Sequence, residues 1–300
     1  MHSFYFIINK QSRNSHDVFK KLLVLLPKHK VDYDFLVTES IEQLDTLLSQ
    51  LKNTIQPTDI IVVVGGDGSL NQFVTFYSKY CFNNPIGYIP AGSGNDFARA
   101  NVIPFDTEEA LFHLFSVKRA KERSVILATQ NQTEHLAVNS IGFGIDGLIG
   151  KFIDSKGKKE KAGGYAYALS IFSGFLKQEK FPLTLTLDDG VHVFDQAQLV
   201  LVANNPYFGG GINIVPQASG VDDQLDILIA DNVNVKDLIS ILSKLFFKQT
   251  HLSHPKLYSF QTKEATVHIN SGQYAQKDGE VFHQDEYMYY FKSEKLLFWI

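Results

Sequence analysis

A glycine-rich loop carrying one acid follows directly on an apolar run at residues 60–64. The loop reads Gly65-Gly66-Asp67-Gly68-Ser69. Glycines allow the backbone to approach a phosphate and to adopt positive φ, and the N–H groups that begin a following helix favour an anion. Because Asp67 would repel phosphate unless a cation intervened, we predict that it binds Mg²⁺ directly or through water. A tight strand-to-helix turn with an exposed aspartate explains the same residues equally well.

A second loop of similar composition reads PAGSGNDFAR at residues 90–99. It contains Ser93 and Asp96, so each loop has a hydroxyl and an acid. The first loop is not a P-loop, which needs a lysine after its last glycine, and it lacks the G-x-G-x-x-G spacing. Asp96 is also a candidate helix N-cap, and Arg99 a candidate surface charge. Two such loops at neighbouring strand ends would converge on one cleft, which favours a binding site over turn chemistry alone.

The elements that must position these loops alternate along the first hundred residues. The patterns predict strands at 4–8, 33–37, 60–64 and 86–89 and helices at 17–26 and 41–51, the second opened by a capping box of Ser40 and Gln43. This order predicts a doubly wound, mostly parallel sheet. Ligands of such sheets lie beyond the carboxyl ends of the strands, where both loops are found.

The second part of the chain has a different pattern. Short strand candidates separated by Gly, Asn and Asp turns occur at 125–128, 136–138, 183–187, 198–203, 225–229, 265–269 and 287–291. They predict an antiparallel sandwich or barrel, interrupted by helices near 165–176 and 235–247. We therefore expect an α/β nucleotide-binding domain at 1–125, to which a tail of about 286–300 returns, and a β-sandwich domain at 126–285.

Composition limits the classes of partner. The 300 residues carry a net charge of −4, with 44% hydrophobic and 20% charged residues, so nothing favours nucleic acid. Cys81 is the single cysteine, which fits a reducing compartment. The start, MHSFYFIINK, lacks the features of an export signal, and the longest aliphatic runs are too short to span a bilayer. We expect a cytoplasmic protein whose membrane contact, if it has one, is peripheral at the inner face.

The two loops together carry a family resemblance. GGDGSLNQ followed by IPAGSGNDFAR resembles the catalytic domain of the diacylglycerol kinase family, which includes sphingosine and ceramide kinases and bacterial lipid kinases. The similarity continues in order through VNSIGFGIDG (138–147), NNPYFGGGINIVPQASGVDDQLDI (204–227), HLSHPK (251–256) and AQKDGE (275–280). The resemblance implies an α/β nucleotide-binding domain, a C-terminal β-sandwich, and Mg²⁺-dependent transfer of the ATP γ-phosphoryl group to a lipid hydroxyl, most simply that of diacylglycerol, giving phosphatidic acid.

The resemblance also implies roles for individual residues. ATP contacts fall on Asn9, Ser12, Thr38, Gly65, Gly66, Asp67, Gly68, Ser69, Asn71, Gln72, Ser93 and Gly94. The acidic catalytic network falls on Asp67, Asp96, Asp222 and Glu280, with Glu280 of DGE as general base. A carboxylate that accepts the proton of a lipid alcohol is chemically required, and clustered acids raise one pKa toward neutrality. Without the resemblance, Lys-Asp-Gly-Glu is an ordinary hairpin turn.

Two departures from the family pattern stand out. The family opens with Asn-Pro-x-Ser-Gly, whereas this chain has Asn9-Lys10-Gln11-Ser12-Arg13, where Lys10 or Arg13 would offer a charge instead. The family's Asp-Gly is here Asp222-Asp223, and aspartate tolerates left-handed backbone geometry. In bacterial members this loop binds a structural Mg²⁺, which here would use the Asp222 carboxylate and the carbonyls of Ser219 and Gln224.

Alternatives remain open for the function and the partners. An NAD kinase-type enzyme shares the GGDG loop, and a non-catalytic nucleotide- or lipid-binding member would explain both departures. A free edge strand in the sandwich would allow a homodimer. His251 and His254 fit a turn better than a metal site. The lysine run at 151–161 is either a solvated loop or a site that docks anionic headgroups next to the lipid substrate at a membrane surface.

Overall fold

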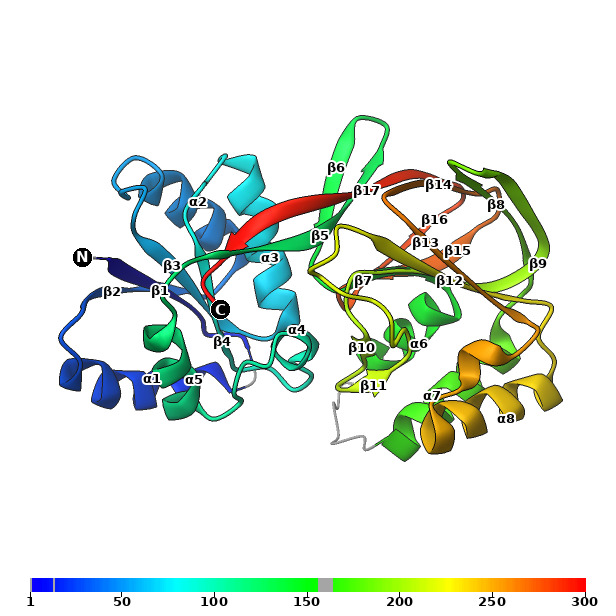
Figure 1. The fold of residues 1–300 in the computed structure, drawn as a ribbon, viewed down its shortest axis with the longest axis horizontal. Coiled ribbons are helices and arrows are strands. Elements are labelled where there is room, and N and C mark those ends of the chain that lie inside the picture. Colours follow the sequence, from blue (N-terminus) through cyan, green and yellow to red (C-terminus); the bar gives the residue numbers. More distant parts are fainter. Residues whose placement is uncertain (1, 13, 156–163) are drawn as a thin grey trace. The chain divides into compact units, whose positions relative to one another are not determined.

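The computed structural model describes residues 2–12, 14–155 and 164–300 (Figure 1). The chain divides into two compact units. Unit 1 comprises Met1–Ser124 and Lys295–Ile300, and unit 2 comprises Val125–Glu294. Among the described residues, no helix combines the length and the hydropathy needed to cross a membrane.

Unit 1 is built on four parallel strands flanked by helices. The strands are β1 (Ser3–Asn9), β2 (Asp32–Thr38), β3 (Ile60–Gly65) and β4 (Ile86–Pro90), which pair in the order β2-β1-β3-β4. The helices are α1 (Ser15–Leu25), α2 (Ile41–Leu51), α3 (Asp67–Lys79), α4 (Asp96–Ala100) and α5 (Thr107–Ser116), with a 3-10 turn η1 (Leu26–Lys28). This arrangement confirms the doubly wound sheet predicted from the sequence.

Helices cover both faces of this sheet. Helices α1 and α5 contact each other on one face, and α2 and α3 contact each other on the opposite face (Figure 1). Every residue of β3 is buried, which explains why its sequence is a continuous β-branched run. The predicted capping box of α2 forms in part. The Ser40 hydroxyl accepts from the backbone N–H of Gln43, but the Gln43 side chain accepts from the N–H of Glu39 instead of that of Ser40.

The last residues of the chain extend the sheet of unit 1. Phe298 pairs in parallel with Ile86, and the backbone N–H of Trp299 donates to the carbonyl of Ile86 at 2.8 Å. The indole N–H of Trp299 donates to the carbonyl of Leu114 in α5 at 3.0 Å. The C-terminal segment is therefore part of the core of unit 1.

Unit 2 contains a large antiparallel sheet around its main apolar core, and a separate two-stranded sheet of β10 and β11. Its strands are β5 (Lys121–Gln130), β6 (Thr133–Ala137), β7 (Ser140–Gly144), β8 (Phe181–Leu187), β9 (Gly190–Ala203), β10 (Tyr207–Phe208), β11 (Ile212–Asn213), β12 (Leu225–Asp231), β13 (Leu257–Thr262), β14 (Glu264–Ile269), β15 (Gln273–Lys277), β16 (Glu280–Gln284) and β17 (Tyr287–Phe298). The main path runs β16-β15-β7-β9-β8-β14-β17, with β12 paired to β9 and β13. The β-sandwich class predicted from the sequence is confirmed.

Helices of unit 2 share a second, smaller apolar cluster. They are α6 (Ile145–Ser155), α7 (Gly164–Lys177) and α8 (Val235–Ser243), followed by a π-helical turn η2 (Lys244–Lys248) and a 3-10 turn η3 (His251–Ser253). The sequence predicts α7 and α8 but misses α6, because Gly147 and Gly150 lower its helix propensity. Gly147 lies against the neighbouring strand: an added Cβ would come within 2.2 Å of the Tyr274 backbone.

Candidate active site

The two glycine-rich loops of unit 1 contact each other through their backbones. The N–H of Ala91 donates to the carbonyl of Gly65 at 2.7 Å. A Cβ added to Gly92 would lie 2.5 Å from the Cα of Gly66, and one added to Gly66 would lie 3.0 Å from the Cα of Gly92. Only glycine at both positions allows this approach, so the convergence predicted from the sequence is confirmed.

Asp67 connects the first loop to the helix that begins in the second. Its two carboxylate oxygens accept from the backbone N–H groups of Asp96 and Phe97, each at 3.0 Å. The residue before α4 is Asn95, whose φ of 54° is left-handed and whose side chain does not cap the helix. The N-cap role considered for Asp96 is therefore wrong: Asp96 is buried in the first turn, and Asp67 caps the helix from the other loop.

The N-terminus of α3 has room for an anion. Helix α3 begins after Gly66, and no side chain caps this end. A Cβ added to Gly68 would meet no atom within 4 Å, so the space above the first turn is open. The first N–H groups of a helix have no partner within the helix and attract negative charge. This end of α3 fits a nucleotide phosphate.

The strand-end loop after β1 braces both glycine loops. The amide of Asn9 donates to the hydroxyl of Ser69 at 2.9 Å, and the Ser12 hydroxyl donates to the carbonyl of Ala91 at 3.2 Å. Asn9 and Ser12 thus keep a structural role although the family's proline and glycine are missing. Lys10 forms an exposed ion pair with Glu39 at 2.7 Å, and Arg13 lies outside the described residues.

The other predicted nucleotide contacts lie on the same edge of the sheet. Thr38 ends β2 and is buried, with its hydroxyl 3.4 Å from the carbonyl of Ile8. Ser93 is exposed and Gly94 is partly exposed in the second loop, while Asn71 is fully buried and Gln72 partly exposed in α3. All predicted ATP-binding residues therefore lie at the carboxyl ends of strands β1 to β3, in the loops that follow β1, β3 and β4, or in the first turns of α3.

In unit 2, Glu280 follows the hairpin turn between β15 and β16. Asp278 and Gly279 form that turn with φ of 44° and 89°. The carboxylate of Asp278 accepts from three successive backbone N–H groups at 2.6, 2.9 and 3.0 Å, those of Val138, Asn139 and Ser140. The hairpin interpretation is correct, and it leaves the Glu280 side chain 43% exposed, with one oxygen 3.9 Å from Nζ of Lys277.

Asp146, which was not predicted as a site residue, is connected to this turn through Gln276. Asp146 accepts from the side-chain amide of Gln276 at 2.7 Å, and the amide oxygen of Gln276 accepts from the N–H of Gly279 at 2.6 Å. Burial raises the pKa of Asp146 to about 6, and the hydrogen bond from Gln276 opposes part of this rise. Asp146 lies within the GFGID stretch of the family resemblance, which was the available signal.

The loop at Asp222 has the geometry expected for a substituted Asp-Gly. Asp223 adopts a φ of 62°, so the prediction that aspartate replaces glycine in left-handed geometry is confirmed. Asp222 accepts from the backbone N–H of Gln224 at 3.2 Å, and the hydroxyl of Ser219 accepts from the N–H of Val221 at 3.3 Å. Ser219, Asp222 and Gln224 are therefore held in one compact loop.

A second acid lies next to this loop. Asp226 is fully buried. Burial, followed by the charge of Asp222, raises the pKa of Asp226 to about 6, and the side chain of Gln217 opposes part of this rise. Two carboxylates beside loop carbonyls fit a hard divalent cation. Among the described residues no three His, Cys, Asp or Glu side chains cluster as metal ligands, so carbonyl oxygens would have to complete the site.

Other candidates from the sequence have structural roles or lie outside the description. The Nε2 of His251 is 2.7 Å from the carbonyl of Ile214, and the Nε2 of His254 is 3.8 Å from Asp237. Of the lysine run, only the side chain of Lys151 is described, with its Nζ 3.9 Å from the centre of the Tyr274 ring. The remaining lysines at 156–161 lie outside the described residues.

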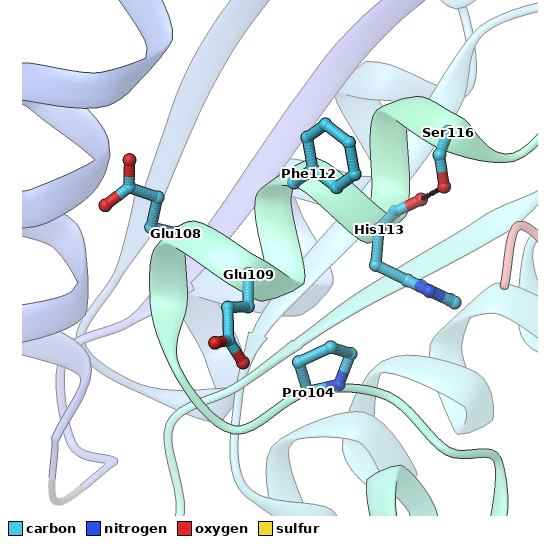
Figure 2. Close-up of a pocket in the computed structure, with 6 residues that line it drawn as sticks. All are labelled: Pro104, Glu108, Glu109, Phe112, His113 and Ser116. Carbon is cyan, nitrogen blue, oxygen red and sulfur yellow. Dashed lines mark hydrogen bonds between the residues drawn. The ribbon is translucent and has the colours of Figure 1, made fainter.

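A surface hollow on α5 is distinct from the glycine loops. Figure 2 shows its lining: Pro104 and the α5 residues Glu108, Glu109, Phe112, His113 and Ser116. None of the predicted site residues lines it. Burial, followed by the charge of Lys121, lowers the pKa of His113. The hollow has no group arranged for nucleotide or lipid chemistry.

Comparisons with known proteins match both units. Residues 3–127 match the family model "Diacylglycerol kinase catalytic domain", and residues 139–286 match "YegS C-terminal NAD kinase beta sandwich-like domain". A Bacillus subtilis protein named "Putative lipid kinase YtlR" is 26% identical over 301 residues, which is 94% of each chain. A Staphylococcus epidermidis protein named "Putative lipid kinase" is 25% identical over 77% of this chain and 73% of its own.

Solved structures share the fold. The crystal structure of "a putative diacylglycerol kinase" from Bacillus anthracis aligns with a TM-score of 0.76 at 21% identity, covering 98% of this chain and 94% of the other. A second structure, of "a diacylglycerol kinases" from the same organism, has a TM-score of 0.71 at 20% identity, covering 97% of this chain and 93% of the other. At this identity the structural likeness concerns the fold.

Proposed function

The chain belongs to the diacylglycerol kinase catalytic-domain family, and from that membership we propose that it transfers the γ-phosphoryl group of ATP to the hydroxyl of a lipid. Diacylglycerol is the proposed acceptor and phosphatidic acid the proposed product. The observation that carries the proposal is the backbone contact between the two glycine-rich loops at the carboxyl ends of β3 and β4.

The donor side of the reaction falls to unit 1. The first turn of α3 offers backbone N–H groups and open space above Gly68 for the phosphates of ATP. Asn9 holds the Ser69 hydroxyl at the same turn, and Ser93 is exposed for a further contact. These groups bind and orient the phosphates, which is most of what a protein contributes to phosphoryl transfer.

The acceptor side needs a base for the lipid hydroxyl. Glu280 is the proposed base, because its carboxylate is partly exposed at the end of a rigid turn. The Asp278 carboxylate holds that turn on three backbone N–H groups, and Gln276 holds the N–H of Gly279. The proton of the acceptor hydroxyl passes to Glu280 as the oxygen bonds to the γ-phosphorus and the bond to the β-phosphate oxygen breaks.

Two acidic sites would hold Mg²⁺. Asp67 and Asp96 are the proposed ligands at the nucleotide, where the Asp67 carboxylate already bridges the two glycine-rich loops through the N–H groups of Asp96 and Phe97. Asp222, with the carbonyls of Ser219 and Gln224, would hold a structural ion beside the buried Asp226. An ion held at Asp67 and Asp96 would supply positive charge to offset that of the phosphates.

Labelled ATP separates the possible acceptors. The protein is incubated with Mg²⁺, γ-labelled ATP and either diacylglycerol in detergent micelles, a panel of other lipid alcohols, or NAD. We expect label in phosphatidic acid. Labelled NADP without labelled lipid would show an NAD kinase-type enzyme, and ATP binding without a labelled product would show a non-catalytic member.

Glu280→Gln tests the proposed base. The substitution keeps the size of the side chain and removes its ability to accept a proton, so we expect the turnover rate to fall by at least about 100-fold. The affinity for ATP, measured by calorimetry, should remain within about twofold because unit 1 is unchanged. Glu134→Gln, at an exposed position of β6, is the matched control and should keep full activity. Unchanged turnover in Glu280→Gln would remove Glu280 from the mechanism.

A further inference from the structure

We propose that the outer face of α8 and η2 docks the protein on an anionic lipid bilayer. The proposal rests on the proposed function in one respect, since a lipid acceptor resides in a bilayer. The face consists of Val235, Ile239 and Phe247, whose exposed fractions are 41%, 57% and 84%. We call it the α8 apolar face. Figure 1 shows α8 at the rim of unit 2.

Val235 and Ile239 lie on one side of α8, since residues four apart share a side of an α-helix. Phe247 follows in the π-helical turn η2, which continues α8, and it is the most exposed of the three. The inner side of the segment carries the buried Leu238, Ile241 and Leu245. An amphipathic helix needs only one apolar side to pack on its protein, so the second apolar side is available for another surface.

The inner side is firmly packed. Leu238 and Ile241 belong to a buried cluster with Ile145 and Ile149 of α6 and Phe175 of α7. The helix begins at a complete capping box between Asn234 and Asp237. The α8 apolar face is therefore presented on a fixed helix, and the exposure of its side chains does not come from fraying.

The charges around the face select an anionic partner. Residues 235–256 contain four lysines, Lys236, Lys244, Lys248 and Lys256, and one acid, in a chain whose net charge is −4. The acid, Asp237, caps its own helix and lies 3.8 Å from His254. Exposed apolar side chains bordered by lysines are typical of helices that lie in the interface of an anionic bilayer.

Phe112 of α5 is also exposed, but acidic residues and not lysines precede it. Phe112 is 72% exposed on α5, where Glu108 and Glu109 precede it by one helical turn (Figure 2). An anionic surface would repel these two carboxylates. Phe112 therefore provides a matched control, because replacing it removes the same exposed side chain without touching the α8 apolar face.

Vesicle binding tests the proposal without ATP. The full chain is sedimented with vesicles of phosphatidylcholine alone or of phosphatidylcholine mixed with phosphatidylglycerol, at low and high salt. We expect binding to the mixed vesicles that weakens with salt. Phe247→Ser and Ile239→Ser should each weaken it about tenfold through lost apolar burial, and Lys248→Gln about fivefold. Phe112→Ser should bind like the parent, and so should Lys30→Gln, which changes an exposed lysine of unit 1 outside the α8 apolar face.

The outcomes separate this proposal from the proposed function. Activity on diacylglycerol in detergent micelles should be unchanged in Phe247→Ser, while activity on vesicles falls with binding. Equal vesicle binding by Phe247→Ser and the parent overturns the docking site, whether or not the protein is a kinase. A change of oligomeric state in Phe247→Ser, seen by analytical ultracentrifugation, also overturns it and assigns the face to a second copy of the chain. Absence of kinase activity with salt-sensitive, Phe247-dependent binding overturns the function and supports the docking site.

Discussion

At the scale of single residues, the glycines of the candidate site have different reasons to be there. Gly92 lies against backbone, since an added Cβ would be 2.5 Å from the Cα of Gly66. Gly68 faces open space, since its Cβ would meet no atom within 4 Å. The sequence shows both as loop glycines and cannot distinguish them, because the difference depends on which segment lies opposite each one.

These two glycines predict opposite effects on stability and binding. Gly92→Ala should lower both the stability of the protein and its ATP affinity, because the backbone contact between the loops must open. Gly68→Ala lies in the first turn of α3 and should keep stability or raise it by up to about 1 kcal/mol, while still weakening ATP binding if phosphates occupy the space above it. Urea unfolding and calorimetric ATP titration measure the two effects. ATP affinity unchanged in Gly68→Ala would place the phosphates elsewhere.

Asp146 makes a prediction about pH. Its pKa is about 6 in the folded protein against an ordinary value of 3.8, so between these values the folded state holds a proton that the unfolded state has lost. The contribution of Asp146 to the free energy of unfolding is therefore most favourable below pH 3.8, and it decreases as the pH rises toward 6. Asp146→Asn removes that loss and should raise stability at pH 7 by up to about 3 kcal/mol.

The measurement compares urea unfolding of Asp146→Asn and the parent at pH 4 and pH 7. The gain should be large at pH 7 and small at pH 4, and the slope that remains in the variant reflects other acids such as Asp226. Glu134→Gln changes an exposed acid of β6 and should leave stability unchanged at both pH values. An equal effect of Asp146→Asn at both pH values would contradict the raised pKa.

At the scale of elements, the sequence correctly predicted the strands and helices that depend mainly on their own residues. The buried β3 follows from its β-branched run, and α2 follows from its capping residues and apolar spacing. Helix α6 was missed because its glycines allow close contact with β15 and β16. A Cβ added to Gly150, for example, would lie only 2.5 Å from a side-chain carbon of Val281. The role of Asp67 as a cap for α4 was missed for the same reason: the donor groups belong to another loop.

The hairpin of β15 and β16 is fixed at its turn by one carboxylate. Asp278 accepts from three backbone N–H groups, and hydrogen bonds to a charged acceptor contribute more than neutral ones. Asp278→Ala should destabilise unit 2 by about 3 kcal/mol, and hydrogen exchange should show loss of protection at the N–H groups of residues 138–140. Asp285→Ala, near the other end of β16, should leave that protection unchanged. Intact protection in Asp278→Ala would mean that the turn is held by its backbone conformation alone.

At the scale of the whole molecule, the two units should respond to different ligands. The proposed nucleotide-binding groups belong to unit 1, whereas the loop of Ser219, Asp222 and Gln224 belongs to unit 2. A ligand that binds only the folded state raises stability by an amount set by its concentration over its Kd, about 2.7 kcal/mol at a hundredfold excess. Mg²⁺ without nucleotide should therefore raise the unfolding temperature through the Asp222 loop.

Matched variants locate that effect. Asp222→Asn should lose the shift caused by Mg²⁺ alone, because a neutral amide replaces the one carboxylate proposed as a ligand in this loop. Asp67→Asn should keep the shift, although its starting stability is lower because α4 loses a charged cap. Calorimetry with Mg²⁺ or with K⁺ at equal ionic strength separates binding from screening. An equal Mg²⁺ shift in Asp222→Asn and the parent would show that the metal binds outside this loop.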